Sequence, residues 1–184
     1  LYILLMFISN NCTIYSFKGT LPDNVDSISI PPIVNGTSDY KIVNILNEDI
    51  IERLTNENIL QIVDLELADS RLDILIEAIN DLPNVYEYQD GSYEKVKQWK
   101  LETVVKLTWY DLNKNKIISE KIIKEWAMYN NIGQDISNDG IDNDNDGFLD
   151  AEDSDEFGLP REGAMRIISS EISDKIMEKI KTTW

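Results

Sequence analysis

Residues 99–127 read WKLETVVKLTWYDLNKNKIISEKIIKEWA, and this stretch decides the fold of the 184-residue chain. From Trp99 to Tyr110 the side chains alternate in polarity with a period of two, as in a β-strand that buries one face. The segment Asn113–Lys116 predicts a turn, and Ile117–Ala127 predicts the returning strand of a hairpin. The alternation points Leu101, Thr103, Val105, Leu107 and Trp109 inward, and Lys100, Glu102 and Lys106 outward.

Shorter patterns on both sides of the hairpin predict the remaining elements. Strands are expected over 27–30, 59–63 and 71–79, the last with Leu72, Ile74, Ile76 and Ala78 on one face. Apolar residues spaced by three and four predict helices over 38–55 and 164–181. A sheet with one polar face and two amphipathic helices buries its apolar surfaces only if both helices lie on one side. The sequence therefore predicts an α+β two-layer sandwich, with a mainly antiparallel sheet of four to five strands and two helices on one face.

Composition narrows the function. The formal charge is −17, but residues 135–157 hold ten acidic residues and no basic one; the remaining 24 acidic and 17 basic residues leave a net charge of −7. A chain this acidic without a basic stripe is not expected to bind nucleic acid. The sequence has no histidine, the commonest general base, so we expect a binding protein and not an enzyme.

The N-terminus resembles the end of a secretory signal peptide. Residues 1–8 (LYILLMFI) are apolar and too few to span a bilayer, and Ser9-Asn-Asn11 then precedes Cys12, the single cysteine. We expect residues 1–11 to be part of a signal peptide and residues 12–184 to be the mature domain. Cys12 would carry the covalent lipid, with several acyl chains forming a durable anchor. The alternative is a buried first strand with an incidental cysteine.

An acidic insert at 133–160 interrupts the domain. Its segment 142–153 (DNDNDGFLDAED) has the pattern of a calcium loop, because acidic residues recur at alternate positions and Gly147 falls where a sharp turn is needed. The absence of Cys and His ligands favours Ca²⁺ over zinc. We expect a structural role for the ion; the alternative is an acidic loop without order. The expected ligands are Asp142, Asp144, Asp146, the Phe148 carbonyl, Asp150 and Asp153.

Five segments, in order along the chain, resemble the LPS-assembly lipoprotein family (LptE) in its Bacteroidetes-like form. They are Cys12–Gly19 (CTIYSFKG), Val25–Ile30 (VDSISI), Asp73–Ile79 (DILIEAI), Trp99–Leu107 (WKLETVVKL) and Ile176–Trp184 (IMEKIKTTW). The insert is similar to the thrombospondin type 3 repeats of secreted bacterial proteins.

The resemblance implies an outer-membrane lipoprotein on the periplasmic side, which plugs the β-barrel partner LptD and passes lipopolysaccharide to the cell surface. Under this interpretation Lys114 and Lys116 at the hairpin tip would contact lipopolysaccharide, and outward aromatic side chains such as Tyr110 would contact the barrel wall. The alternative is a Ca²⁺-stabilised surface lipoprotein that binds a glycan or a protein.

Overall fold

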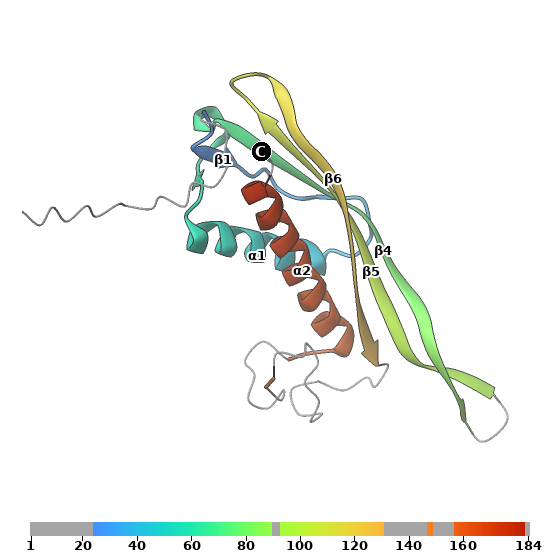
Figure 1. Cartoon of the computed structure of the whole chain (residues 1–184). Helices are drawn as coiled ribbons and strands as arrows, with labels where there is room; N and C mark the ends of the chain where they lie inside the picture. The colour runs from blue at the N-terminus through green and yellow to red at the C-terminus, as the bar shows by residue number, and fades with distance from the viewer. Residues whose placement is uncertain (1–23, 90–92, 131–146, 149–156, 183–184) are drawn as a thin grey trace, which may run out of the picture.

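The computed structural model describes residues 24–89, 93–130, 147–148 and 157–182. It contains six strands and two long helices in an α+β arrangement (Figure 1). No helix in these residues is both long enough and apolar enough to cross a membrane. The strands are β1 (Ser27–Ser29), β2 (Val34–Asn35), β3 (Gln61–Ile62), β4 (Ser70–Gln89), β5 (Tyr93–Asp111) and β6 (Lys116–Asn130); the helices are α1 (Lys41–Glu57) and α2 (Pro160–Thr182), with a short 3₁₀ turn η1 (Leu65–Leu67).

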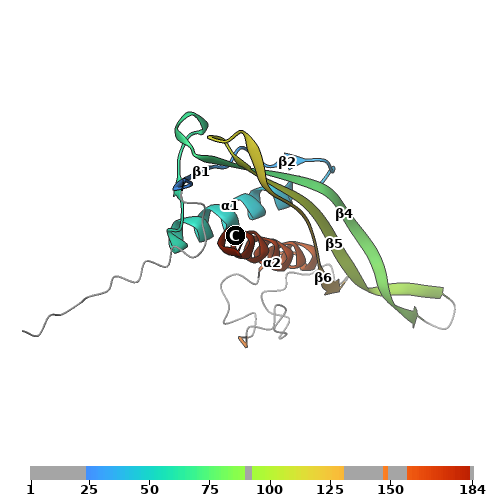
Figure 2. The ribbon, with the colours of Figure 1, turned by 45° about the horizontal axis from the view of Figure 1, so that its top comes forward.

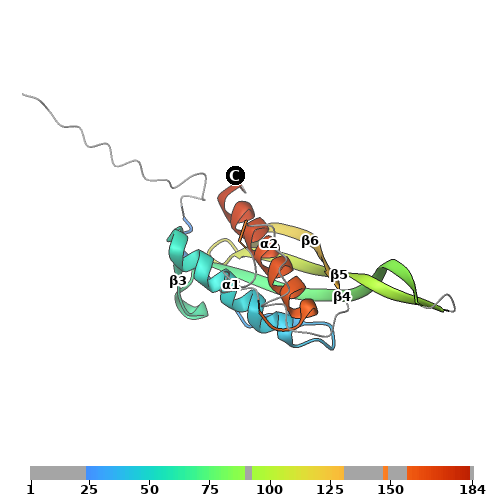
Figure 3. The ribbon, with the colours of Figure 1, turned by 90° about the horizontal axis from the view of Figure 1, so that it is seen from below.

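Both long helices cover the same, concave side of the curved sheet (Figure 2). Seen from below, they cross the sheet next to each other (Figure 3). Their periodic apolar residues meet the inward row of the sheet, as the spacing predicts. The five β5 residues expected to point inward are each at most 1% exposed. The core is formed by Ile42, Leu46, Ile50 and Leu54 of α1, Ile168, Ile172 and Ile176 of α2, and Leu72, Ile76, Leu101, Val105, Trp109 and Ile123 of the sheet.

The sheet is mixed and six-stranded: its three long strands are antiparallel as expected, but the expected four to five strands are corrected to six, because three short strands add parallel pairs. Its order is β3-β1-β4-β5-β6, with β2 also paired to β4. β4, β5 and β6 are antiparallel, whereas β1 pairs in parallel with β3 and β4, and β2 in parallel with β4. The physical reason is the connection: α1 carries the chain from β2 back to β3, and a helical crossover joins parallel strands.

A bulge in β4 changes which residues face the core. The register between β4 and β5 shifts between Ile76 and Ala78, so Ile79, and not the expected Ala78, packs against the core. Gly36 lies against this bulge and donates its N–H to the Ile76 carbonyl at 2.8 Å. A Cβ at position 36 would lie 2.9 Å from that oxygen, so the position requires glycine.

Candidate partner-binding surface

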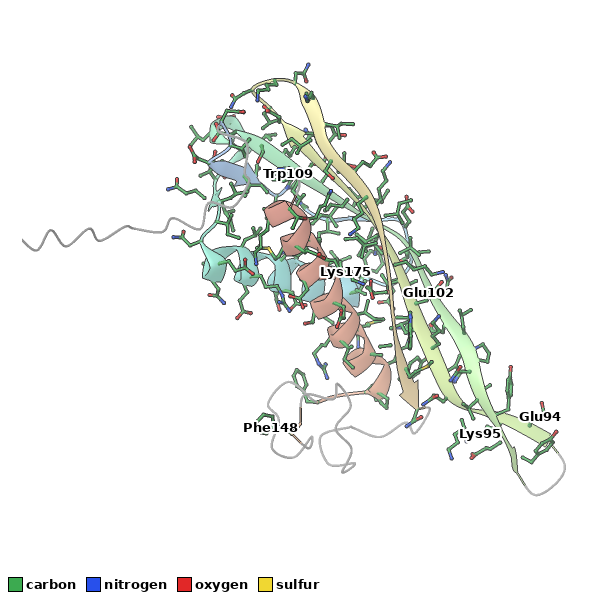
Figure 4. All side chains as sticks on the ribbon, viewed as in Figure 1. Glu94, Lys95, Glu102, Trp109, Phe148 and Lys175 are labelled. Atoms are coloured by element: carbon green, nitrogen blue, oxygen red, sulfur yellow. The ribbon has the colours of Figure 1, made fainter. Side chains whose placement is uncertain are left out.

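The convex face of β4, β5 and β6 carries the outward side chains, which neither α1 nor α2 covers (Figures 2 and 4). We call this surface the outer face and define it by the outward rows of the three strands. Its apolar members include Ile122, with 62% of its surface exposed, and Trp126, with 52% exposed. Its members are Arg71, Asp73, Leu75, Ala78, Asn80, Leu82, Lys100, Glu102, Val104, Lys106, Thr108, Tyr110, Glu120, Ile122, Lys124, Trp126 and Met128.

At the centre of the outer face, Glu102 forms ion pairs with Lys100 and Lys124. Lys124 Nζ lies 2.9 Å from Glu102 Oε1, and Lys100 Nζ lies 3.4 Å from Glu102 Oε2. The same Lys100 ammonium lies 4.9 Å from the centroid of the Trp126 ring, within cation–π range. Glu102 points outward as the alternation predicts, yet it is only 8% exposed, because the two lysines cover it. The hydrogen bond from Lys124 lowers the pKa of Glu102, so this charged cluster persists at neutral pH.

The hairpin of β4 and β5 extends beyond the helices as a two-stranded ribbon, the distal arm (residues 86–89 and 93–97; Figure 1). The returning strand β6 ends opposite Gln98, so no third strand of the described residues pairs with the arm. Tyr86 pairs with Val96, and Tyr88, 76% exposed, pairs with Glu94. Glu94 and Lys95 lie near the far end of the arm, away from both helices (Figure 4). The arm therefore offers exposed aromatic side chains well outside the core.

The opposite end of the sheet is where the chain enters the domain. Asp69 accepts hydrogen bonds from the Ser27 hydroxyl at 2.7 Å and from the Asn113 amide at 3.1 Å, and these bonds lower its pKa. Asp111 is 3% exposed and accepts bonds from Lys114 N at 2.8 Å and Asn24 Nδ2 at 3.1 Å. Burial alone would raise the pKa of Asp111, but these bonds outweigh it and lower the pKa. This hydrogen-bond network joins the turn between β5 and β6 to Asn24 and Ser27, which follow the expected lipid anchor Cys12 in the sequence.

Lys114 and Lys116, the expected lipopolysaccharide contacts, lie at this end but differ in environment. Lys114 forms an ion pair with Asp111 and a hydrogen bond with Asn24, so it braces the turn. Lys116 opens β6 as an exposed residue. Tyr110, the expected wall contact, is half-buried under the Arg71 guanidinium, whose carbon lies 4.8 Å from the ring centroid.

A shallow groove lies on the outer side next to β2 and η1. Pro31, Val34 and Leu65 form its apolar wall, and Arg71 and Lys106 contribute two cations. Arg71 also donates to Asp73 at 2.8 Å, which fixes its head group. The groove can accept a ligand that has an apolar part and an acidic group.

Arg161 lies in the first turn of α2 and directly follows the acidic insert in the sequence. Its Nε and Nη2 each lie 2.9 Å from an oxygen of Asp81, and its Nη1 lies 2.6 Å from Asp39. Tyr129 donates to the same Asp81 at 2.7 Å. Burial works against ionisation of Asp81, but the bonds from Arg161 and Tyr129 lower its pKa overall. For Tyr129, burial and the Asp81 hydrogen bond raise the pKa to about 12. No periodic pattern in the sequence points to Arg161, because its partners Asp39 and Asp81 come from two distant segments.

The expected calcium loop lies outside the described residues, apart from Gly147 and Phe148. Gly147 has a φ of +103°, a backbone conformation that only glycine adopts readily and that a sharp turn needs. Phe148 is exposed, and Figure 4 shows it at a distance from the sheet. The five expected aspartate ligands lie outside the described residues, so the calcium site stays a prediction.

Solved proteins of low sequence identity share this fold. A Xanthomonas campestris protein of family DUF330 is 6% identical, with a TM-score of 0.52 over 89% of this chain and 90% of its own. A hypothetical protein from Chlamydia trachomatis is 11% identical, with a TM-score of 0.51 over 85% of this chain and 96% of its own. Rare lipoprotein B from Shewanella oneidensis is 18% identical over 84% of this chain and 89% of its own, with a lower TM-score of 0.42. No family model and no curated protein matches the chain. The likeness to the first two concerns the fold alone.

Proposed function

We propose that this chain is an outer-membrane lipoprotein, anchored through Cys12, that plugs and helps assemble the β-barrel translocon for lipopolysaccharide, with an LptD-like barrel as its partner. The observation that carries the proposal is the outer face. A sheet that is covered by helices on one side only, and that exposes Ile122 and Trp126 on the other, has a surface suited to a protein wall. The sequence resemblance to the LptE family is the reason for proposing an LptD-like barrel as that wall.

The chemistry of the outer face fits a protein partner better than a reaction. Trp126 is exposed and held by Lys100, as interface aromatic residues are when they anchor a complex. Its charged neighbours Glu102 and Lys124 are already paired, so they can enter an interface without leaving an isolated charge. We assign no catalytic role to these residues.

The proposed calcium site has a structural role. Ten carboxylates between 135 and 157 repel one another, and a hard divalent cation would offset that repulsion. Arg161 would then hold the end of the loop against β4 through Asp81.

A second candidate function rests on the groove at β2. A Ca²⁺-stabilised surface lipoprotein could bind an acidic glycan or a protein segment there, with Arg71 and Lys106 as the cations. The groove shares Arg71 and Lys106 with the outer face, whereas Val34 lines the groove alone and Trp126 belongs to the outer face alone, so variants of Val34 and Trp126 separate the candidates.

Co-purification tests the proposal. The tagged full-length chain, extracted from outer membranes, should bring down a large β-barrel protein that mass spectrometry identifies as a lipopolysaccharide exporter. Trp126→Ala should reduce the yield of the barrel several-fold, whereas the matched control Val34→Ala, in the groove and 61% exposed, should not. Recovery of no barrel, or equal loss with the control variant, would refute the role of the outer face.

A further inference from the structure

Strand β6 forms a long open edge of the sheet. In the order β3-β1-β4-β5-β6 it stands at the end, and within the described residues it pairs with β5 alone. The opposite edge strand, β3, has only two residues. Beyond the residues that pair with β2, β4 contains Pro83, and its register with β5 shifts at three places. Proline and such irregularities discourage the pairing of a further strand. β6 contains no proline or glycine, and its pairing with β5 is regular from Ser119 to Asn130.

The charges along β6 suit a particular occupant of this edge. Lysine-rich edges repel a second copy of themselves, which is one way in which proteins protect an edge. Residues Glu120–Glu125 read EKIIKE, so the charges are mirrored about two central isoleucines, and each face of the strand carries one acidic and one basic residue. In an antiparallel pair, residues directly opposite share a face, and a two-fold axis through Ile122 places Glu120 of one copy opposite Lys124 of the other, twice.

We propose that β6 pairs antiparallel with β6 of a second copy of this chain, with the two-fold axis at Ile122. This pairing buries Ile122, which is 62% exposed in the single chain, against its own counterpart. Within the chain Glu120 pairs with Lys106 at 3.1 Å and Lys124 with Glu102 at 2.9 Å, but the side chains of Glu120 and Lys124 are still 50% and 58% exposed, so each can take a second partner across the axis. The backbone donors and acceptors on the open side of β6 become paired at the same time. An axis at Ile123 would instead pair Ile123 with itself and Lys121 with Glu125, but this row faces the helices, where Ile123 is only 2% exposed and Glu125 already pairs with Lys175 of α2, so the axis at Ile122 is favoured.

Site-specific crosslinking tests the register. The full chain carrying Cys12→Ser has no other thiol, so one added cysteine reports on one position. Ile122→Cys should form a disulfide-linked dimer under mild oxidation. Trp126→Cys, a control on the same strand with similar exposure, should not, since four residues from the axis on each copy separate the two thiols by about 27 Å.

Charge exchange between copies tests the partner. Glu120→Lys and Lys124→Glu each place like charges opposite one another, so each should self-associate at least about tenfold more weakly by analytical ultracentrifugation. A one-to-one mixture of the two variants should associate again, because each supplies the charge that the other lacks; thermal unfolding confirms that both are folded. A monomeric parent chain, equal crosslinking at 122 and 126, or a mixture that stays monomeric would overturn the proposal. If the Ile122→Cys variant, which lacks the Cys12 anchor, crosslinks in a cell extract only to a different protein, the edge of β6 binds a foreign strand and the proposal is overturned. None of these outcomes changes the co-purification test of the proposed function.

Discussion

Arg161→Met tests whether the guanidinium at the start of α2 stabilises the fold. Methionine keeps the aliphatic part of the side chain and removes every hydrogen-bond donor. The substitution breaks two bonds of 2.9 Å to Asp81 and one of 2.6 Å to Asp39. It also leaves two partly buried carboxylates without their cation.

The size of the effect follows from this geometry. A hydrogen bond to a charged group contributes about 1.5–3 kcal/mol when it is buried, but Arg161 and Asp81 are each about a third exposed, which reduces the contribution through solvent screening. We expect the free energy of unfolding to fall by about 1–2 kcal/mol. For a chain of this size that corresponds to a decrease in Tm of about 2–8 °C.

The pH dependence provides a second readout. The pKa of Asp81 is lowered in the folded chain, so its contribution is complete above the ordinary carboxyl pKa and is lost as the pH falls through the folded value. Urea unfolding should therefore show a difference between wild type and Arg161→Met that is largest near neutrality and shrinks in acid. Lys97→Met is the control, since its ion pair with Glu87 is exposed and 3.9 Å long, and it should change stability by a few tenths of a kcal/mol. Equal stability of wild type and Arg161→Met, or a difference that grows in acid, would refute the reasoning.

Three further predictions concern other parts of the chain. Gly36→Ala should lower the free energy of unfolding by about 1–3 kcal/mol in urea titrations, because the new Cβ meets the Ile76 carbonyl at 2.9 Å; an unchanged midpoint would show that the strand can shift freely. Asp111→Asn should remove part of the loss of stability on acidification, because the folded pKa of Asp111 is lowered and its contribution disappears as the pH falls through that value; parallel pH profiles for mutant and wild type would contradict this. Isothermal titration with Ca²⁺ should give heat for the wild type and much less for Asp142→Ala with Asp146→Ala, and no heat from the wild type would exclude the site.

The central part of the fold could be predicted because period-two alternation leaves little choice. The inward row of β5 follows from the sequence alone, and both helices appear within a few residues of their predicted ranges. Strand lengths were harder, since β4 continues to Gln89 and β5 begins at Tyr93, where the arm has no buried face to impose a pattern. The strand β2 and the turn η1 were not predicted, because two or three residues are too few to show a periodic pattern.

The functional surface was predictable only in part. The alternation placed Lys100 and Glu102 on the outward side, but it could not show that Lys124 covers Glu102 from the neighbouring strand. Trp126 lies in the predicted returning strand, but its exposure follows from the position of α1 and α2 on the concave side (Figure 2), which the alternation does not show. The alternation also puts Ile122 on the outward side, but its exposure was not predicted, because an isoleucine is ordinarily assumed to be buried. Long-range partners of this kind are set by topology and not by local sequence.

Photo-crosslinking in intact outer membranes tests the central claim most directly. A photoreactive residue at position 126 lies on the outer face, and one at Tyr40, 75% exposed beside α1, lies away from it. The account predicts that the probe at 126 crosslinks to a large β-barrel exporter of lipopolysaccharide and that the probe at 40 does so far less. Crosslinks to no barrel from 126, or equal yields from the two positions, would contradict the assignment of this chain as a barrel plug.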